Sequence, residues 1–146
     1  MNAEWGYILN FLAYLGVSLP LMFLGVLLFV LTTPYHEFRI MTEGAQLADQ
    51  QKVAAAKAVA FDLGGKVVGQ ALVLASAVYH SVSLWDLVIW GVIGAVALVV
   101  VYYVFELLTP FLKVRQEIPK GNTAVGIFSF CLSMATGLLM AALISY

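Results

Sequence analysis

Charged side chains are scarce in this chain of 146 residues, because Asp, Glu, Lys and Arg together make up only 10% of it. Its single cysteine, Cys131, excludes an internal disulfide, and we expect it to be a small buried apolar residue. The net charge of −1 gives no electrostatic basis for binding nucleic acid. The sequence contains no glycine-rich phosphate loop, nucleophile elbow or HExxH motif. We therefore expect no enzymatic activity, no cofactor and no metal site.

Apolar residues, in contrast, are abundant, at 63% of the chain with a mean hydropathy of +0.99. A soluble domain of this size could not bury so much apolar surface, so the sequence predicts an integral membrane protein. A span needs about 20 apolar residues. Four such stretches predict an all-α protein with transmembrane helices at residues 7–32, 58–79, 87–108 and 123–145. The first stretch follows only Glu4 and lacks the basic start of a signal peptide, so we expect it to be retained.

The basic residues predict the orientation. Five of them follow the first and third spans, whereas the N-terminal tail, residues 79–86 and the C-terminus carry none. They are Arg39, Lys52, Lys113, Arg115 and Lys120. The positive-inside rule then places both basic loops in the cytoplasm and both termini outside. An aromatic belt is expected at the outer face, formed by Trp5, Tyr7, Tyr79, Trp85, Trp90 and Tyr146.

Two helix-ending motifs indicate an internal repeat. Thr33-Pro34-Tyr35 and Thr109-Pro110-Phe111 are 76 residues apart, and proline stops a helix at each. We expect two tandem helical hairpins in the same orientation, residues 1–80 and 81–146. The first carries about nine extra residues, rich in helix formers, so the second helix should begin in the cytoplasm within residues 45–57. Inverted repeats, typical of many transporters, need an odd number of spans in each repeat. Each repeat expected here has two spans, which disfavours an alternating-access transporter.

Three segments carry a resemblance to a known family. They are TPYHEFRIMTEG, GGKVVGQALVLASAVYHSVSLWDLVIWG and KGNTAVGIFSFCLSMATGLLMAAL. Together they resemble the YjfL-like bacterial inner-membrane proteins, a domain-of-unknown-function family (family 350) built of two tandem helix pairs. The resemblance implies a four-span protein of the bacterial inner membrane. The chain departs from the family where residues 45–57 replace a Gly-Asn-x-Ala-type helix entry, and Lys57, Asp62 and Lys66 then follow in a helix that is mostly apolar in the family.

A polar stripe crosses the second predicted span. Asp62, Lys66 and Gln70 are spaced i, i+4 and i+8, so they share one helix face. One interpretation is the lining of an ion or proton pathway at an oligomer axis. The other is an Asp62–Lys66 ion pair with Lys66 reaching toward the headgroups. Glu106 is a further candidate, either facing Lys66 or paired at the interface with Lys113 or Arg115.

Small residues at four-residue spacing predict close helix packing. Such spacing lets helix backbones approach in lipid, where no hydrophobic drive acts between helices. We expect the second and fourth spans to form the tightly packed core. The small residues concerned are Gly65, Gly69, Gly91, Ser133, Gly137 and Ala141.

These features predict a protein that works within an assembly. The first hypothesis is an oligomeric accessory or scaffolding subunit, whose cytoplasmic extension of the second helix docks a partner. The alternative is a small homo-oligomeric channel or transport component with Asp62, Lys66 and Gln70 on a water-filled path. Expected partners are the lipid bilayer, further copies of the chain, and a cytoplasmic or membrane protein.

Overall fold

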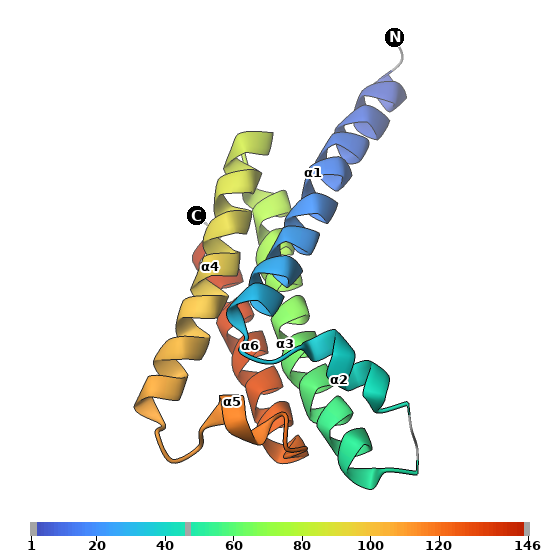
Figure 1. The fold of residues 1–146 in the computed structure, drawn as a ribbon. Coiled ribbons are helices and arrows are strands. Elements are labelled where there is room, and N and C mark those ends of the chain that lie inside the picture. The colour runs from blue at the N-terminus through green and yellow to red at the C-terminus, as the bar shows by residue number, and fades with distance from the viewer. Residues whose placement is uncertain (1–2, 46–47, 145–146) are drawn as a thin grey trace.

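Four long helices and two short ones make up the computed structural model, which describes residues 3–45 and 48–144 (Figure 1). In chain order they are α1 (Ala3–Thr32), α2 (Glu37–Glu43), α3 (Gln50–His80), α4 (Leu84–Leu108), α5 (Val114–Glu117) and α6 (Thr123–Ile144). The described residues contain no strand. The helices α1, α3, α4 and α6 are long and apolar enough to cross a bilayer, which confirms the predicted all-α class and the four spans. Ser145 and Tyr146 lie outside the described residues.

The close approach of α3 and α6 forms the centre of the bundle. A Cβ atom added at Gly69 would lie 2.6 Å from the carbonyl oxygen of Ser133, and one at Gly126 would lie 2.5 Å from that of Ala58. A Cβ at Gly137 would meet the backbone of Gly69 itself. Real Cβ atoms essentially never come so close, so only glycine permits this helix separation.

Other small residues on these helices lie at the same contact. A Cβ at Gly65 would meet the backbone of Phe130, and the hydroxyl of Ser76 on α3 donates to the carbonyl of Ala141 at 2.6 Å. Gly91 on α4 faces a different neighbour, because its Cβ would lie 2.9 Å from the side chains of Leu21 and Leu74. The outer face of α6 carries Cys131, which is exposed, so the expectation that it is buried is wrong.

Helix α1 joins the bundle from about Tyr14 onward, because Tyr14 and Val17 already pack against a cluster of α3 and α4 residues. It remains helical through Pro20, and Phe29 near its end is fully buried against α3 and α4. Its first turns stand clear of the other helices, as Figure 1 shows. Large apolar side chains along this segment are accordingly exposed, among them Tyr7, Phe11 and Leu12.

The two short helices close the same end of the bundle (Figure 1). Helix α2 packs along the start of α3, where Asp49 caps the helix by accepting from the backbone N–H groups of Gln51 and Lys52. Helix α5 buries Val114 and the following Ile118 against α3. Gly121 has a φ of 90°, a left-handed conformation that favours glycine. The next residue, Asn122, caps α6 because its side-chain oxygen accepts from the N–H of Val125.

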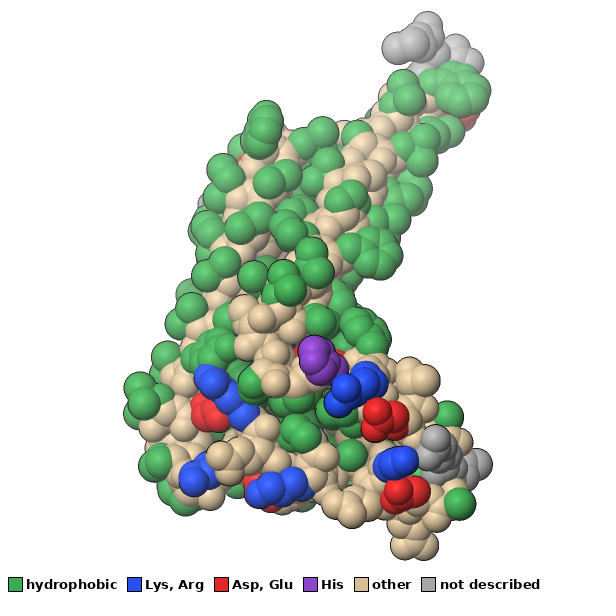
Figure 2. Space-filling view, viewed as in Figure 1, with side chains coloured by type: hydrophobic (Ala, Val, Ile, Leu, Met, Phe, Trp, Pro, Cys, Tyr) green, Lys and Arg blue, Asp and Glu red, His purple; other side chains and the backbone are tan. Residues whose placement is uncertain are grey.

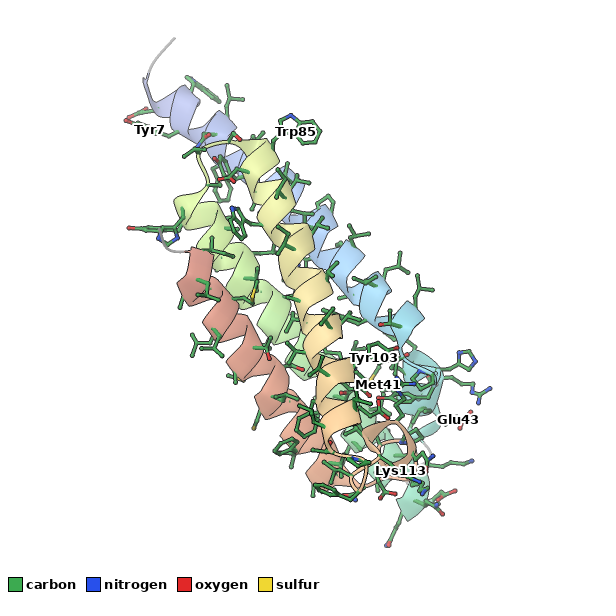
Figure 3. All side chains as sticks on the ribbon, turned by 90° about the vertical axis from the view of Figure 1, so that its left-hand side faces the viewer. Tyr7, Met41, Glu43, Trp85, Tyr103 and Lys113 are labelled. Carbon is green, nitrogen blue, oxygen red and sulfur yellow. The ribbon has the colours of Figure 1, made fainter. Side chains whose placement is uncertain are left out.

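The basic side chains gather at one end of the molecule. Lys and Arg side chains lie at the end that carries α2 and α5, while the long upper part of this face is almost entirely apolar (Figure 2). Tyr7 and Trp85 lie at the far end from Glu43 and Lys113 (Figure 3). Such an uneven distribution is typical of a protein whose apolar belt lies in a bilayer.

Candidate functional site

The ion pair at the centre of the polar stripe is buried within the bundle. Asp62 and Lys66 lie one turn apart on α3, with 2.7 Å between the carboxylate and the ammonium nitrogen. The side chains are 0% and 5% exposed. The pair predicted as one alternative is therefore present, but Lys66 stays inside the protein instead of extending to the headgroups.

Asp62 is held by donors from three parts of the chain. Besides Lys66, the hydroxyl of Tyr35, in the α1–α2 connection, donates to one carboxylate oxygen at 2.7 Å. The hydroxyl of Ser129 on α6 donates to the other oxygen. Burial and the nearby Asp62 charge raise the pKa of Tyr35 well above its usual range, so its hydroxyl keeps its proton and serves as a donor.

The ammonium group of Lys66 has an aromatic partner as well. Its nitrogen lies 4.2 Å from the centroid of the Tyr102 ring on α4, a distance at which the ring face attracts a cation. The hydroxyl of Tyr102 is buried and has no hydrogen-bond partner of normal geometry among the described residues. Helices α3, α4 and α6 and the α1–α2 connection thus enclose the pair within one chain.

Gln70 continues the stripe one turn further along α3. Its amide nitrogen donates to the carbonyl of Gly91 on α4 at 3.0 Å, and its amide oxygen is buried without a described partner. A Cβ at Gly25 on α1 would lie 3.1 Å from the Gln70 side chain. Gln70 therefore lies at the junction of α1, α3 and α4.

Glu106 belongs to a separate ion pair. Its carboxylate accepts from Arg115 at 2.6 Å, and the guanidinium carbon of Arg115 lies 4.5 Å from the centroid of the Tyr103 ring. The Tyr103 hydroxyl donates to the carbonyl of Thr32 at the end of α1. Of the two alternatives for Glu106, the structure contains the pairing with Arg115.

One buried carboxyl was missed by the sequence analysis. Glu37, at the start of α2, is 1% exposed, and neither of its carboxylate oxygens has a hydrogen-bond partner that meets normal geometry among the described residues. Burial raises its pKa, and its own backbone N–H, Thr33 and Lys66 offset this effect in part. A sequence signal was available, because Ile40 and Met41 follow at i+3 and i+4 and place Glu37 on the apolar face of α2.

Six side chains form one cluster that joins α3, α4, α6, α2 and the α1–α2 connection. They are Tyr35, Glu37, Asp62, Lys66, Tyr102 and Ser129. The cluster brings together ionisable side chains and hydroxyl groups that are largely shielded from water, so it can hold charges and protons at fixed positions. Within the part of the chain that the structure describes, no group of three His, Cys, Asp or Glu side chains is placed to hold a metal ion.

Comparisons with known proteins agree with this architecture. The model of the family described as Domain of Unknown Function (DUF350) matches residues 3–144. The UPF0719 transmembrane protein YshE of Bacillus subtilis (strain 168) is 35% identical over 130 residues, which cover 89% of each chain. No solved structure matches. The match across nearly the whole chain, together with the four spans, confirms the predicted resemblance, and this chain is a multi-pass membrane protein that belongs to the DUF350 family.

Proposed function

We propose that the protein is an accessory subunit of a membrane assembly and that copies of it associate through the first turns of α1, residues 4–13. The observation that carries this proposal is the position of that segment, which leaves the bundle while the rest of α1 packs against α3 and α4 (Figure 1). Lipid or another protein must cover it on all sides. A further copy of the chain is the partner we propose.

A small and polar face on α1 supports association between helices. Gly6, Asn10 and Ala13 are spaced i, i+4 and i+7, so they lie on one face, and all three are exposed. The Asn10 side chain has no hydrogen-bond partner in residues 3–45 or 48–144. An amide in an apolar helix gains from a hydrogen bond across a helix interface, and Gly6 and Ala13 permit the close approach that such a bond needs.

Disulfide cross-linking tests this interface directly. In a Cys131→Ser background, Ala13→Cys should form a dimer in native membranes on mild oxidation, because Ala13 lies on the proposed face and Asn10 is left intact. Phe11→Cys is the matched control, since Phe11 is also exposed but points to nearly the opposite side of α1. Equal cross-linking at both positions, or none at either, would contradict the proposal.

The proposed setting is a bacterial inner membrane, with both termini outside and the α2 and α5 end in the cytoplasm. The gathering of Lys and Arg at that end supports this orientation (Figure 2). The exposed Tyr7 and Trp85 at the other end lie where an interfacial aromatic belt is expected (Figure 3). In this setting the start of α3 lies in the cytoplasm and is the surface proposed to meet a soluble partner. The proposal includes no catalytic step.

A small transport component is the second candidate function. The observation that favours it is the buried pair of Asp62 and Lys66, because ionisable side chains at membrane depth often mark ion or proton pathways. The enclosure of the pair within one chain argues against a path between copies. Flux of protons, cations or anions through the purified protein in liposomes would support this candidate, and the absence of all three would leave the accessory role.

A further inference from the structure

Two carboxyl groups are fully buried near the α2 end of the bundle, and they differ in their hydrogen-bond partners. Asp62 receives hydrogen bonds from Tyr35, Lys66 and Ser129. Glu37 is 1% exposed and receives none of normal geometry from the described chain. A carboxylate removed from water without hydrogen bonds or a counter-ion is strongly disfavoured, and such a group normally takes up a proton instead.

The groups around Glu37 leave it without a counter-charge of its own. The cation whose charge acts on Glu37, Lys66 on α3, is bound to Asp62 and stacked on Tyr102 of α4. The connection contributes Tyr35, whose hydroxyl is directed to Asp62. Ionised Glu37 and Asp62 would share the single positive charge of Lys66, so the cluster is neutral only when one of the carboxyl groups is protonated.

The arginine side chains at the edge of the cluster are already paired with other carboxylates. Arg39, on α2, pairs with Glu43 at 3.4 Å in an exposed position. Arg115 pairs with Glu106 near the end of α4. Helix α6 faces the cluster with Ser129, which carries no charge. Asp62 already accepts from three donors, whereas Glu37 has none of normal geometry among the described residues, so Glu37 is the group suited to take the proton.

A route for that proton exists at the surface of the same segment. A hollow of about 410 Å³ is lined by Val30, His36, Glu37, Phe38 and Arg39. Figure 2 shows the outline of the molecule hollowed at the junction of α1 with α2. Helix α2 is only seven residues long and packs mainly on α3, so a small displacement would bring water to the Glu37 carboxyl.

We propose that Glu37 is a proton-binding site: the folded protein holds it as a carboxylic acid while α2 lies on α3, and the proton is released when α2 moves away. This inference goes beyond the accessory role and does not depend on it. The raised pKa of Glu37, which burial causes, agrees with the geometry. The direction of the effect on stability follows from this shift. A carboxyl whose pKa is higher in the folded state stabilises the fold at low pH, and this stabilisation is lost as the pH rises from the ordinary value of 4.5 through the folded-state pKa.

Infrared spectroscopy of the protein in lipid tests the protonation state. At neutral pH the full chain should give the carbonyl-stretch band of a carboxylic acid, which ionised carboxylates lack. Glu37→Gln should remove this band. Glu43→Gln should keep it, because Glu43 lies on the same short helix but is exposed and paired with Arg39. A wild-type spectrum without the band, or a band that persists in Glu37→Gln, would overturn the proposal.

Thermal stability measured against pH gives a second, independent readout. The melting temperature of the wild-type protein and of Glu43→Gln should fall as the pH rises above 4.5, whereas Glu37→Gln should lose this part of the dependence because it cannot release a proton. Identical pH profiles for all three proteins would contradict the proposal. If Glu37→Gln does not fold, the wild-type protein alone decides the question. An acid band that disappears as the pH rises, over the same range in which the melting temperature falls, supports the site. A spectrum without the acid band excludes the site.

Discussion

At the scale of single residues, Asp62 accepts hydrogen bonds from three side chains within the part of the chain that the structure describes. It accepts from Lys66, Tyr35 and Ser129, which come from α3, the α1–α2 connection and α6. A buried ion pair need not stabilise a protein relative to a pair of apolar residues, but breaking it by removing one partner is costly. The energetic role of the cluster is therefore best seen by removing its members one at a time.

Substitution of Asp62 should be more damaging than loss of its tyrosine donor. Asp62→Asn leaves Lys66 as an uncompensated buried cation, and we expect a loss of about 3–5 kcal/mol. Tyr35→Phe removes one hydrogen bond to a charged group, which is worth about 1.5–3 kcal/mol. Tyr79→Phe is the control, because Tyr79 is exposed and should change stability little. Melting temperatures in detergent measure the order, and equal effects of Asp62→Asn and Tyr79→Phe would contradict it.

The structure changes the expectation for a double apolar replacement of the ion pair. If Asp62 and Lys66 merely neutralise each other, as the ion-pair interpretation of the sequence has it, Asp62→Leu/Lys66→Leu should be tolerated, because two apolar residues suit lipid. The hydroxyls of Tyr35 and Ser129 are directed to Asp62, however, and both would lose their acceptor inside the protein. Each unsatisfied buried donor costs about 1–3 kcal/mol. We therefore expect the double variant to be destabilised as well, and Tyr35→Phe added to it should recover part of the loss.

At the scale of helices, the contact between α3 and α6 depends on backbone approaching backbone. Gly69 and Gly137 face each other across it, and Gly65 and Gly126 lie where larger residues would meet the partner helix. In lipid such packing replaces the hydrophobic drive that holds soluble helices together. Of the other long helices, α4 packs against both members of this central pair, and α1 packs against α3 and α4.

Bulky substitutions should separate the glycines of α3 into two groups. Gly69→Leu forces a side chain against the Ser133 carbonyl, and overpacking of this kind costs about 1–3 kcal/mol or more. Gly64→Leu is the matched control on the same helix, because nothing lies within 4 Å of its Cβ position. The yield of monodisperse protein in detergent measures the difference. Similar yields for the two variants would show that the close contact is not required.

Sequence alone predicts that Gly25, in the first span, is peripheral and that Gly25→Leu matters less than Gly69→Leu. The structure buries Gly25, so this prediction is wrong and Gly25 is unsuitable as the control for this series. A Cβ there would lie 3.1 Å from the Gln70 side chain. The amphipathic pattern is weak in a helix that is apolar all round, so the sequence of α1 does not indicate which side meets the bundle. Only the position of the helix in space shows that Gly25 covers Gln70.

At the scale of the whole molecule, the number and approximate ends of the spans could be predicted, because length and hydropathy set both. The ends of α1 at Thr32 and of α4 at Leu108 could be predicted from the proline residues that follow them. The surroundings of the stripe could not be predicted. The i, i+4 spacing placed Lys66 near Asp62, but the donors Tyr35 and Ser129 come from 27 residues before and 67 residues after Asp62. Such contacts depend on how the helices pack, and sequence periodicity carries no information on them.

The orientation remains a prediction that labelling can test. In a Cys131→Ser background, Val82→Cys and Gln116→Cys place one exposed thiol in each end region of the molecule. An impermeant thiol reagent should label Val82→Cys on intact spheroplasts and Gln116→Cys only after the membrane is opened, because the basic α5 end should face the cytoplasm. Labelling of Gln116→Cys alone on intact spheroplasts would reverse the topology.

The unequal lengths of the helices have a consequence for the surrounding lipid. Helix α1 has 30 residues and α6 has 22, which correspond to about 45 and 33 Å, against a hydrocarbon core of about 30 Å. A bilayer that fits α6 is too thin for an upright α1, and an isolated helix responds to hydrophobic mismatch by tilting. Figure 1 shows α1 inclined to the other long helices. Because α1 is one continuous helix that is packed on the bundle from about Tyr14 onward, it cannot tilt alone, and the lipid around its exposed first turns must adapt instead. Acyl-chain length thereby becomes a variable that acts on this protein.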